Sequence, residues 1–549
     1  MFRNILLFCL LTSTLHLTAQ RQDSIRNAGI FGNWLGWDFT ENERDSMMES
    51  LRDFRKVYED MHGLNINNAT PYPFAYIPAT DETVIPKQVS TSPTWNIPKG
   101  ITLPANRNEL AFYPVTKLAS LIKSKKISSV ELTRFFLDRL KKYDDTVHCV
   151  ISYTEEIAMQ QARKADEDLK KGIYHGPLHG IPYGLKDLFA VKGTKTTWGS
   201  TPYKDQMVDE DAFVYKKLRD AGAVLCAKLS LGALAYDDLW FGGRTNNPWN
   251  LKEGSSGSSA GSAAATSAGL LPFAIGTETW GSIISPSSTC GVTGLRPTFG
   301  SVSRSGAMVL SWSLDKIGPI CKTAEDAAIV FSIIKGSDSK DPSSVERGFR
   351  FESNSQGKKL RVAYAKNYFD RLKKDRLEWK VIDDFKKMGY DLIPVDFPDS
   401  AVYKADIMNI ILSAESSAAF EELTLSGKDD LIERQDKNFW PNIFRSGRFI
   451  PAAEYINANR HRYALSVAMN NFMKPYDVLI VPSFAGNQSA ITNLTGHPVI
   501  CFPIGFNQQG LPASISLVGN LYDEGSILLA AKAYQEFTGH EEKHPSFFQ

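Results

Sequence analysis

Hydrophobic residues recur at helical spacing in several segments of the chain, beginning near Phe112. In the segment 129–143, for example, Leu132, Phe136 and Leu140 fall on one helical face. This spacing predicts helices over the stretches 115–125, 129–143, 155–171 and 211–221. Short apolar runs bounded by turn residues predict strands instead, and one of them, 224–227, directly follows the helix stop at Gly222.

The same alternation continues through the C-terminal half of the chain. It predicts a strand over 360–364, a helix over 377–388, and further strands over 392–395, 478–481, 499–502 and 515–518. A last helix is expected to run from its N-cap at Asp523 to about Phe537. Continuous apolar strands between amphipathic helices indicate an α/β fold with a largely buried sheet.

Residues 1–19 have the pattern of a secretory signal. Arg3 supplies a positive charge, an apolar run follows over 5–11, and Ala19 precedes a tolerable cleavage site before Gln20. We therefore expect an exported protein, periplasmic or extracellular, with a buried N-terminal helix as the alternative. No later stretch offers about 18 continuous apolar residues, so the sequence predicts no membrane span.

Residues 20–110 have the pattern of a helical and extended N-terminal arm. Thr40 and Glu43 form a capping box ahead of a helix over 41–61, and a proline-rich connection without helical period follows. We expect this arm either to wrap over the main domain or to help form a homodimer. The catalytic domain is expected over 111–549, with about 337–486 covering the substrate entrance.

The charge balance and the cysteine content exclude several classes of function. Lys plus Arg number 62 against 61 for Asp plus Glu, a balance that argues against binding to nucleic acid or an anionic membrane. The cysteines beyond the signal segment are widely spaced and form no CxxC pair, which predicts buried thiols rather than a disulfide framework or a zinc site. These residues are Cys149, Cys226, Cys290, Cys321 and Cys501.

Two segments carry candidate chemistry. Lys186 lies in the apolar stretch GIPYGLKDLF (180–189), and a desolvated lysine has a lowered pKa and can act as a base. The stretch 254–288 joins a serine- and glycine-rich loop to an apolar run and to GTETWGSI, whose backbone N–H groups would form an oxyanion hole before Ser282. Taken singly, Lys186 with Asp187 also fits an ordinary surface pair, the serine- and glycine-rich loop a linker or turn, and GTETWGSI a tight loop between core elements.

A different serine competes for the role of nucleophile. The run GSSAG at 257–261 is formally a G-x-S-x-G motif, which would place Ser259 on the elbow of an α/β-hydrolase. That elbow requires a strand directly before it, and the preceding segment 244–254, RTNNPWNLKEG, is turn-forming rather than strand-like. The pattern therefore disfavours Ser259.

Together, the motifs HGIPYGLKDLF, GSSGSSAGSAAA and GTETWGSIISPSSTCGVTGLRPTFG resemble those of the amidase signature family of serine amidases. The resemblance covers roughly 112–535 and extends to GHPVICFPIGF and GLPASISLVG near the C-terminus. It implies a central mixed, twisted sheet covered by helices on both faces. It also implies catalysis without a metal or cofactor.

Matched motif by motif, Ser282 resembles the nucleophile, Ser258 a bridging serine in a cis peptide, and Lys186 the base. The resemblance implies that Lys186 deprotonates Ser258, which in turn deprotonates Ser282 as it attacks an amide. Oxyanion-hole amides are implied at Thr279, Trp280 and Gly281, and Asp187 and Ser259 are expected to support the triad.

Two positions depart from the family pattern. Trp280 stands where many members have glycine, and a side chain is tolerable there only if φ stays negative. Ile284 stands where many members carry arginine, and its apolar side chain favours a neutral or apolar substrate.

The residues leave several functions open. The first is a secreted amidase that acts on a small-molecule or peptide amide. The alternative is the glutaminase subunit of a tRNA-dependent amidotransferase, against which the signal segment argues. An esterase that uses Ser259 and a non-enzymatic binding protein are the remaining hypotheses.

Overall fold

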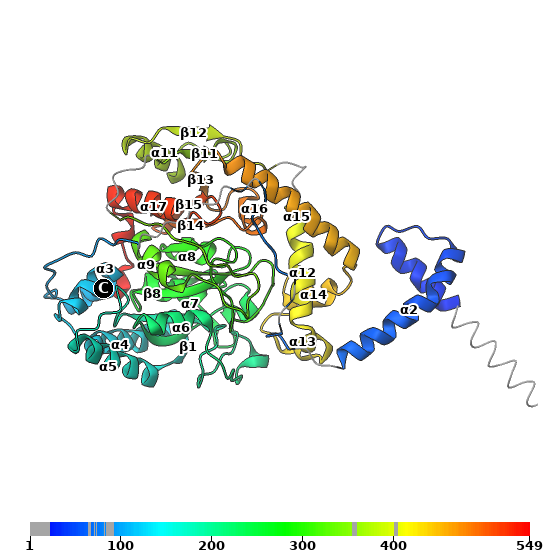
Figure 1. The fold of residues 1–549 in the computed structure, drawn as a ribbon, viewed down its shortest axis with the longest axis horizontal. Coiled ribbons are helices and arrows are strands. Elements are labelled where there is room, and N and C mark those ends of the chain that lie inside the picture. Colours follow the sequence, from blue (N-terminus) through cyan, green and yellow to red (C-terminus); the bar gives the residue numbers. More distant parts are fainter. Residues whose placement is uncertain are drawn as a thin grey trace, which may run out of the picture. The chain divides into compact units, whose positions relative to one another are not determined.

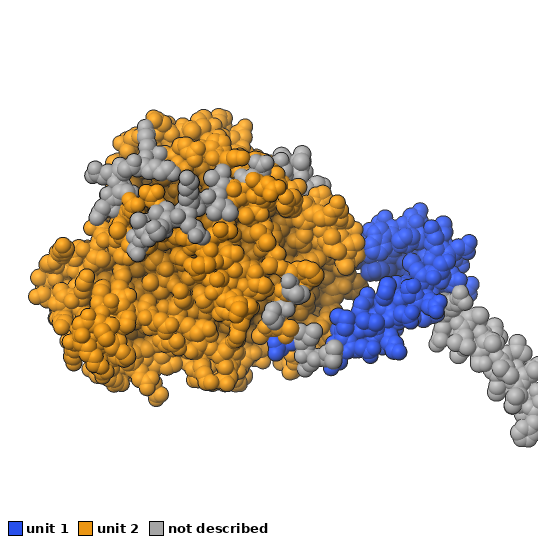
Figure 2. Space-filling view, viewed as in Figure 1, with its two compact units in different colours: residues 1–67 blue, residues 68–549 orange. Residues whose placement is uncertain are grey.

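The computed structural model describes residues 22–63, 67–70, 72, 74–81, 83, 93–353, 360–399 and 405–549. The chain divides into two compact units, residues 1–67 and 68–549, which Figure 2 shows in separate colours. The predicted secretory signal lies outside the described residues. The catalytic-domain boundary that we expect near residue 110 stays a prediction.

An eleven-stranded mixed sheet forms the centre of the second unit (Figure 1). Its strands are β1 (Val150–Tyr153), β2 (Pro182–Lys186), β3 (Val224–Leu229), β8 (Phe273–Glu278), β9 (Thr293–Arg296), β10 (Lys316–Cys321), β11 (Val362–Ala365), β12 (Leu392–Val395), β13 (Val478–Pro482), β14 (Val499–Phe506) and β15 (Pro512–Gly519). They lie in the order β1-β3-β2-β8-β10-β9-β14-β15-β13-β11-β12. Because β2 pairs in parallel with β3 and β8 while β10 pairs antiparallel with β8, the predicted mixed sheet is confirmed.

The helices follow the predicted pattern closely. In the first unit, residues 22–34 are helical and are followed by α2 (Glu41–His62). The second unit contains α3 (Val115–Lys123), α4 (Ser129–Val147), α5 (Glu155–Lys170), α6 (Phe213–Asp220), α7 (Ala260–Ser267), α8 (Ile284–Cys290), α9 (Ala324–Ile334), α10 (Lys366–Phe369), α11 (Leu377–Lys387), α12 (Ile407–Ala419), α13 (Glu421–Leu425), α14 (Trp440–Gly447), α15 (Ala452–Met473), α16 (Gln488–Leu494) and α17 (Glu524–Thr538). Among the described residues, no helix is both long and apolar enough to span a bilayer.

Local capping explains where two of these helices begin. Thr40 accepts a hydrogen bond from the Glu43 amide and Glu43 accepts one from the Thr40 amide, so the predicted capping box of α2 is confirmed. Ser128 caps α4 in the same way. Asp523 is the N-cap residue of α17, as predicted, but its side chain makes no capping bond to a backbone amide and accepts a hydrogen bond from the Ser526 hydroxyl at 2.8 Å.

Helices cover both faces of the sheet (Figure 1). Helices α9 and α17 pack against each other and against β10 and β14, whereas α7 and α8 pack together against β8 and β14. Every residue of α7 is buried, and its sequence AGSAAATS contains only small side chains, so this helix can approach the sheet closely. The five predicted core cysteines are all buried free thiols, which confirms that prediction.

Candidate active site

Lys186 is the last residue of β2, and its side chain is fully buried. Its Nζ atom lies 2.7 Å from Ser258 Oγ, 2.9 Å from Thr277 Oγ1 and 3.1 Å from Ser259 Oγ. Burial holds the pKa of Lys186 well below its usual range, although the charges of Asp315 and Glu278 act in the opposite direction. The neutral amine can therefore accept a proton from a neighbouring hydroxyl.

The loop before α7 presents Ser258 to this amine. The peptide bond between Gly257 and Ser258 is cis, as the family resemblance implies. A Cβ atom on Gly257 would lie only 1.8 Å from the Asp237 carbonyl oxygen, so only glycine fits at this position. Asp238 Oδ2 accepts a hydrogen bond from the Ser256 amide at 3.0 Å, which fixes the loop from its other side.

The hydroxyl of Ser259 forms hydrogen bonds to Lys186 and Thr277. It accepts hydrogen bonds from Lys186 Nζ and from the Thr277 amide, and it donates one to the Thr277 carbonyl at 3.1 Å. These bonds tie the loop to β8 and place Ser259 beside the amine, where the sequence led us to expect a supporting residue.

The expectation that the segment 244–254 lacks strands is wrong. Strands β6 (Asn246–Asn247) and β7 (Asn250–Gly254) form a small antiparallel hairpin there. The turn-forming residues make the tight connection, in which Asn247 Oδ1 accepts a hydrogen bond from the Trp249 amide at 3.0 Å. Because this hairpin is separate from the central sheet, it does not create the strand-to-helix elbow of an α/β-hydrolase.

Ser282 approaches from the loop between β8 and α8. Its carbonyl accepts a hydrogen bond from the Ser259 amide at 3.1 Å, which joins the two serine loops. Ser258 is 1% exposed and Ser282 is 9% exposed, so Ser282 is the more accessible of the two serines. The same loop contains Thr279, Trp280 and Gly281, whose amides the sequence led us to expect in an oxyanion hole.

Backbone conformation within this loop depends on glycine. Gly281 has a φ of +89°, a value that L side chains rarely adopt. Trp280 is not among the residues with positive φ, and its side chain is 43% exposed. The tryptophan side chain is therefore accommodated in solvent. Its φ is not positive, which is the condition for a side chain at this position.

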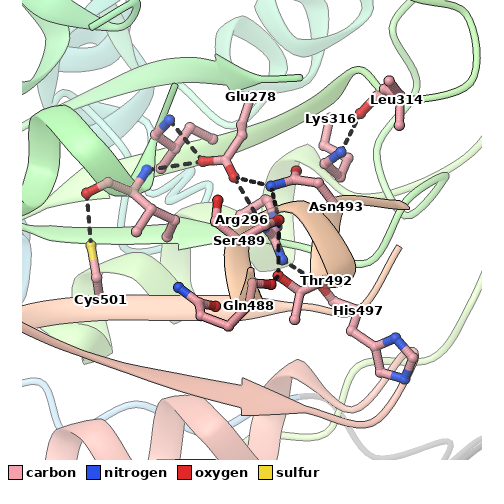
Figure 3. A network of polar contacts seen from close by, with 12 residues as sticks. Glu278, Arg296, Leu314, Lys316, Gln488, Ser489, Thr492, Asn493, His497 and Cys501 are labelled. Carbon is pink, nitrogen blue, oxygen red and sulfur yellow. Dashed lines mark hydrogen bonds and ion pairs between the residues drawn. The ribbon is translucent and has the colours of Figure 1, made fainter. Parts of the chain in front are cut away.

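A buried carboxylate fixes the chain directly after Ser282 (Figure 3). Glu278 Oε2 accepts hydrogen bonds from the Ile283 and Ile284 amides, both at 2.9 Å, and its Oε1 accepts from Arg296 and Asn493. Burial alone would raise the pKa of Glu278, but the Arg296 guanidinium and these hydrogen bonds lower it to about 2. The ionised carboxylate thus holds the start of α8 and the turn before it.

A second carboxylate contacts the segment that contains the predicted oxyanion-hole amides. Thr279 Oγ1 donates to Asp315 Oδ1 at 2.6 Å, and Asp315 Oδ2 accepts from the Leu310 and Ser311 amides. Burial raises the pKa of Asp315, against the effect of these hydrogen bonds. Asp315 therefore links the loop 310–315 to the loop that contains Ser282.

Asp187 supports the site through a neighbouring pair rather than through Lys186. Its Oδ1 forms a fully buried ion pair with Lys228 Nζ at 2.7 Å, and its Oδ2 accepts from the Thr197 amide and hydroxyl. The Lys228 charge offsets that of Asp187, so this carboxylate has its own partner beside the Lys186 backbone.

Comparison with known proteins agrees with this arrangement. The family model described as Amidase matches residues 131–492. A glutamyl-tRNA(Gln) amidotransferase subunit of Coxiella burnetii (strain RSA 493 / Nine Mile phase I) is 33% identical over 479 residues, which cover 78% of this chain and 98% of that protein. The chain belongs to the amidase family.

Solved structures of other amidase-family proteins have the same fold. The native peptide amidase from Stenotrophomonas maltophilia aligns with a TM-score of 0.69 and 26% identity, covering 79% of this chain and 98% of that one. The corresponding glutamyl-tRNA(Gln) amidotransferase subunit from Thermotoga maritima aligns with a TM-score of 0.64 and 25% identity, covering 79% and 96%. The predicted amidase-signature fold is confirmed.

Within this amidase-family site, Ile284 is nearly fully buried. It belongs to an apolar cluster that also contains Leu314, Tyr368 and Phe397. An apolar group therefore fills the position where the family resemblance leads us to expect a cation in many members.

Sequence reasoning missed three polar residues of the site: Thr277, Glu278 and Asp315. Thr277 and Glu278 lie inside the motif GTETWGSI, so their proximity to Ser282 in the sequence was a usable signal. Asp315 lies 36 residues beyond Thr279, and no local pattern connects the two. The pairing of β8 with β10 brings them together.

Proposed function

We propose that the chain hydrolyses a carboxylic amide through an acyl-enzyme on Ser282, with Ser258 as proton relay and Lys186 as base. The observation that carries this proposal is the fully buried Lys186 amine, 2.7 Å from Ser258 Oγ. Burial disfavours the ammonium form, and the polar groups within hydrogen-bond distance of Nζ are hydroxyls and a carbonyl rather than a carboxylate that would keep it charged.

The proton moves along a relay in the proposed reaction. Neutral Lys186 takes the proton of Ser258, which takes the proton of Ser282 as that oxygen bonds to the amide carbon. Backbone N–H groups of residues 279–282 stabilise the oxyanion, a contribution of about 3–4 kcal/mol per donor in other enzymes. When the C–N bond breaks, Ser258 protonates the leaving nitrogen. Water then releases the acid by the reverse relay.

Two versions of this reaction differ in substrate and partner. In the first, the chain is an exported amidase for a small-molecule or peptide amide. In the second, it hydrolyses glutamine within a tRNA-dependent amidotransferase. The names of the sequence relatives support the second version better, whereas the similarity to a peptide amidase structure favours the first. Export is a proposal that rests on residues 1–19 alone.

Labelling with a fluorophosphonate probe, combined with amide turnover, tests the proposal. We expect the wild type to be labelled, Ser282→Ala to lose both labelling and turnover, and Ser259→Ala to keep the label. Loss of the label only in Ser259→Ala would overturn the assignment. Turnover of L-glutamine compared with a neutral amide separates the two versions, since an amidotransferase of this kind must release ammonia from glutamine.

A further inference from the structure

An aromatic-walled cavity of about 410 Å³ lies in the second unit. Tyr72, Phe74 and Trp312 line it, with ring centroids 5.4 Å apart for Tyr72 and Phe74 and 5.8 Å apart for Tyr72 and Trp312. Phe74 is 74% exposed, so a large apolar ring faces solvent at this cavity. Three clustered rings provide a surface that suits an apolar or aromatic group.

Two of these rings come from a segment outside the family match, which begins at residue 131. Asn68 fixes that segment to the cavity wall, because its side chain donates to the Val309 carbonyl at 2.8 Å and accepts from the Val309 amide at 2.9 Å. Further along, the Arg462 guanidinium lies 3.4 Å from the Tyr76 ring centroid, and Tyr76 donates to the Leu494 carbonyl at 3.0 Å. Asn68 and Tyr76 are therefore held against distant parts of the second unit by long-range contacts.

The wall of the cavity includes residues that adjoin the candidate site. A second space of about 10 Å³, with room for about one water molecule, shares the lining residues Arg304, Ala307, Met308 and Asp315 with the first. It is also lined by Thr277 and Thr279. Thr277 Oγ1 is 2.9 Å from Lys186 Nζ, so the wall that the two spaces share adjoins the candidate site.

The charged side chains of this wall are already paired. Glu210 forms an ion pair with Lys340 at 3.3 Å, and Arg304 binds both carboxylate oxygens of Asp341. Asp315 accepts three hydrogen bonds, one from the Thr279 hydroxyl and two from the Leu310 and Ser311 amides. A charged ligand would have to compete with these partners, so the lining favours a neutral one.

We infer that Tyr72, Phe74 and Trp312 form a subsite for an aromatic or other apolar group of a neutral amide, and that the N-terminal arm thereby determines substrate selectivity. The inference rests on the proposed amide hydrolysis at Ser282. An apolar ring on either the acyl side or the amine side of the amide would suit this subsite, and the substrates of the test distinguish the two.

The test compares kcat/KM for three amides: propanamide, 3-phenylpropanamide with its ring on the acyl side, and N-benzylpropanamide with its ring on the amine side. We expect the wild-type chain to prefer at least one aromatic amide. Trp312→Ala and Tyr72→Ala should each lower that preference about tenfold, the scale on which apolar pockets discriminate, with propanamide changing less than about twofold. Asn68→Ala should also lower the preference, because it removes the hydrogen bonds to Val309 that fix the segment with Tyr72 and Phe74.

Phe537→Ala is the matched control, because this phenylalanine is 50% exposed at the end of α17 and does not line the cavity. It should leave the preference unchanged. The subsite is overturned if wild type shows no aromatic preference, if it hydrolyses only glutamine, or if Trp312→Ala and Tyr72→Ala behave like the control.

Absence of any Ser282-dependent hydrolysis would instead reject the proposed function. In that case, calorimetric titration of 3-phenylpropanamide into the full chain decides the subsite separately. Binding that is weakened by Trp312→Ala and not by Phe537→Ala supports it. No binding, or equal binding by both variants, overturns it.

Discussion

At the scale of single residues, the surroundings of Lys186 determine what its amine can do. Ser258, Ser259 and Thr277 surround Nζ with hydroxyl groups, while the adjacent carboxylate of Asp187 pairs with Lys228. A carboxylate in contact with Lys186 would stabilise the ammonium and oppose the lowering of its pKa by burial. Because the adjacent Asp187 carboxylate pairs with Lys228, it does not hold a charge on Lys186, the base that we propose.

The pH dependence of catalysis should reveal this base. Because the neutral amine is the active form and burial lowers the pKa of Lys186, kcat/KM should rise with pH and level off well below the usual lysine pKa. Lys186→Met should lose on the order of a thousandfold or more in kcat. A pH–rate profile of wild type alongside the variant checks both expectations, and near-wild-type turnover in Lys186→Met would contradict them.

Asp238 should make stability depend on pH in the opposite sense from most carboxylates. Burial, with the nearby charge of Asp237, raises the pKa of Asp238 from 3.8 to about 6. Its stabilising contribution is therefore complete below pH 3.8 and is lost as pH rises to about 6. Asp238→Asn should keep the size of the side chain while gaining stability relative to wild type across this window.

Thermal unfolding of both proteins at intervals between about pH 4 and pH 7 measures the effect. A difference between the two that grows with pH is expected, and parallel curves would show that Asp238 does not titrate in this way.

At the scale of elements, strand β8 organises the site. Its residue Thr277 contacts Lys186 and Ser259, and its last residue, Glu278, binds the backbone just after Ser282. Glycine at position 276 permits this packing, because a Cβ atom there would lie 2.6 Å from Ser259 Oγ. One strand therefore carries contacts to all three candidate catalytic segments.

Glu278→Gln tests the role of this strand end. The pKa of Glu278 is lowered from 4.5 to about 2, so the carboxylate contributes about 3 kcal/mol of stability above pH 4.5, which is lost as pH falls toward 2. The variant should be less stable than wild type at about pH 7. Its kcat should fall while its KM changes less, because the turn at Ser282 is no longer fixed.

Urea unfolding at about pH 7 and about pH 3, together with steady-state kinetics, checks this prediction. Ser489→Ala serves as the control, because Ser489 accepts the Asn493 hydrogen bond through its backbone carbonyl, which the substitution retains. Equal stability of wild type and Glu278→Gln at neutral pH would contradict the assigned role.

At the scale of the whole molecule, the site belongs entirely to the second unit. Lys186, Ser258 and Ser282 all lie within residues 68–549, as does the anchor Asn68. The part of the arm beyond residue 67 therefore belongs to the second unit, whereas the helices of residues 22–34 and α2 belong to the first unit.

Deletion of residues 1–67 should leave a folded protein. Its hydrolysis of propanamide should stay within about twofold of the full chain, because the contacts that hold the site lie in the second unit. Circular dichroism, thermal unfolding and kcat/KM check this outcome. Loss of a cooperative transition in the shortened protein would show that the first unit is needed for folding.

The sequence by itself determined the parts of this protein that depend on local pattern. Helical spacing and the Thr40–Glu43 capping box set the helices to within a few residues, and the ordered motifs identified the family and the segments with Lys186, Ser258 and Ser282. Local pattern failed at the hairpin β6–β7, where the closure of the turn decides the outcome.

Only the tertiary structure decided which distant groups meet. Thr277 reaches Lys186 across 91 residues, Asn493 reaches Glu278 across 215, and Asn68 reaches Val309 across 241. Such contacts depend on strand order and register and on the paths of long loops, which no short-range periodicity encodes. For the same reason, no local pattern predicts the aromatic cavity, which Tyr72 and Phe74 line together with Trp312 of a distant loop.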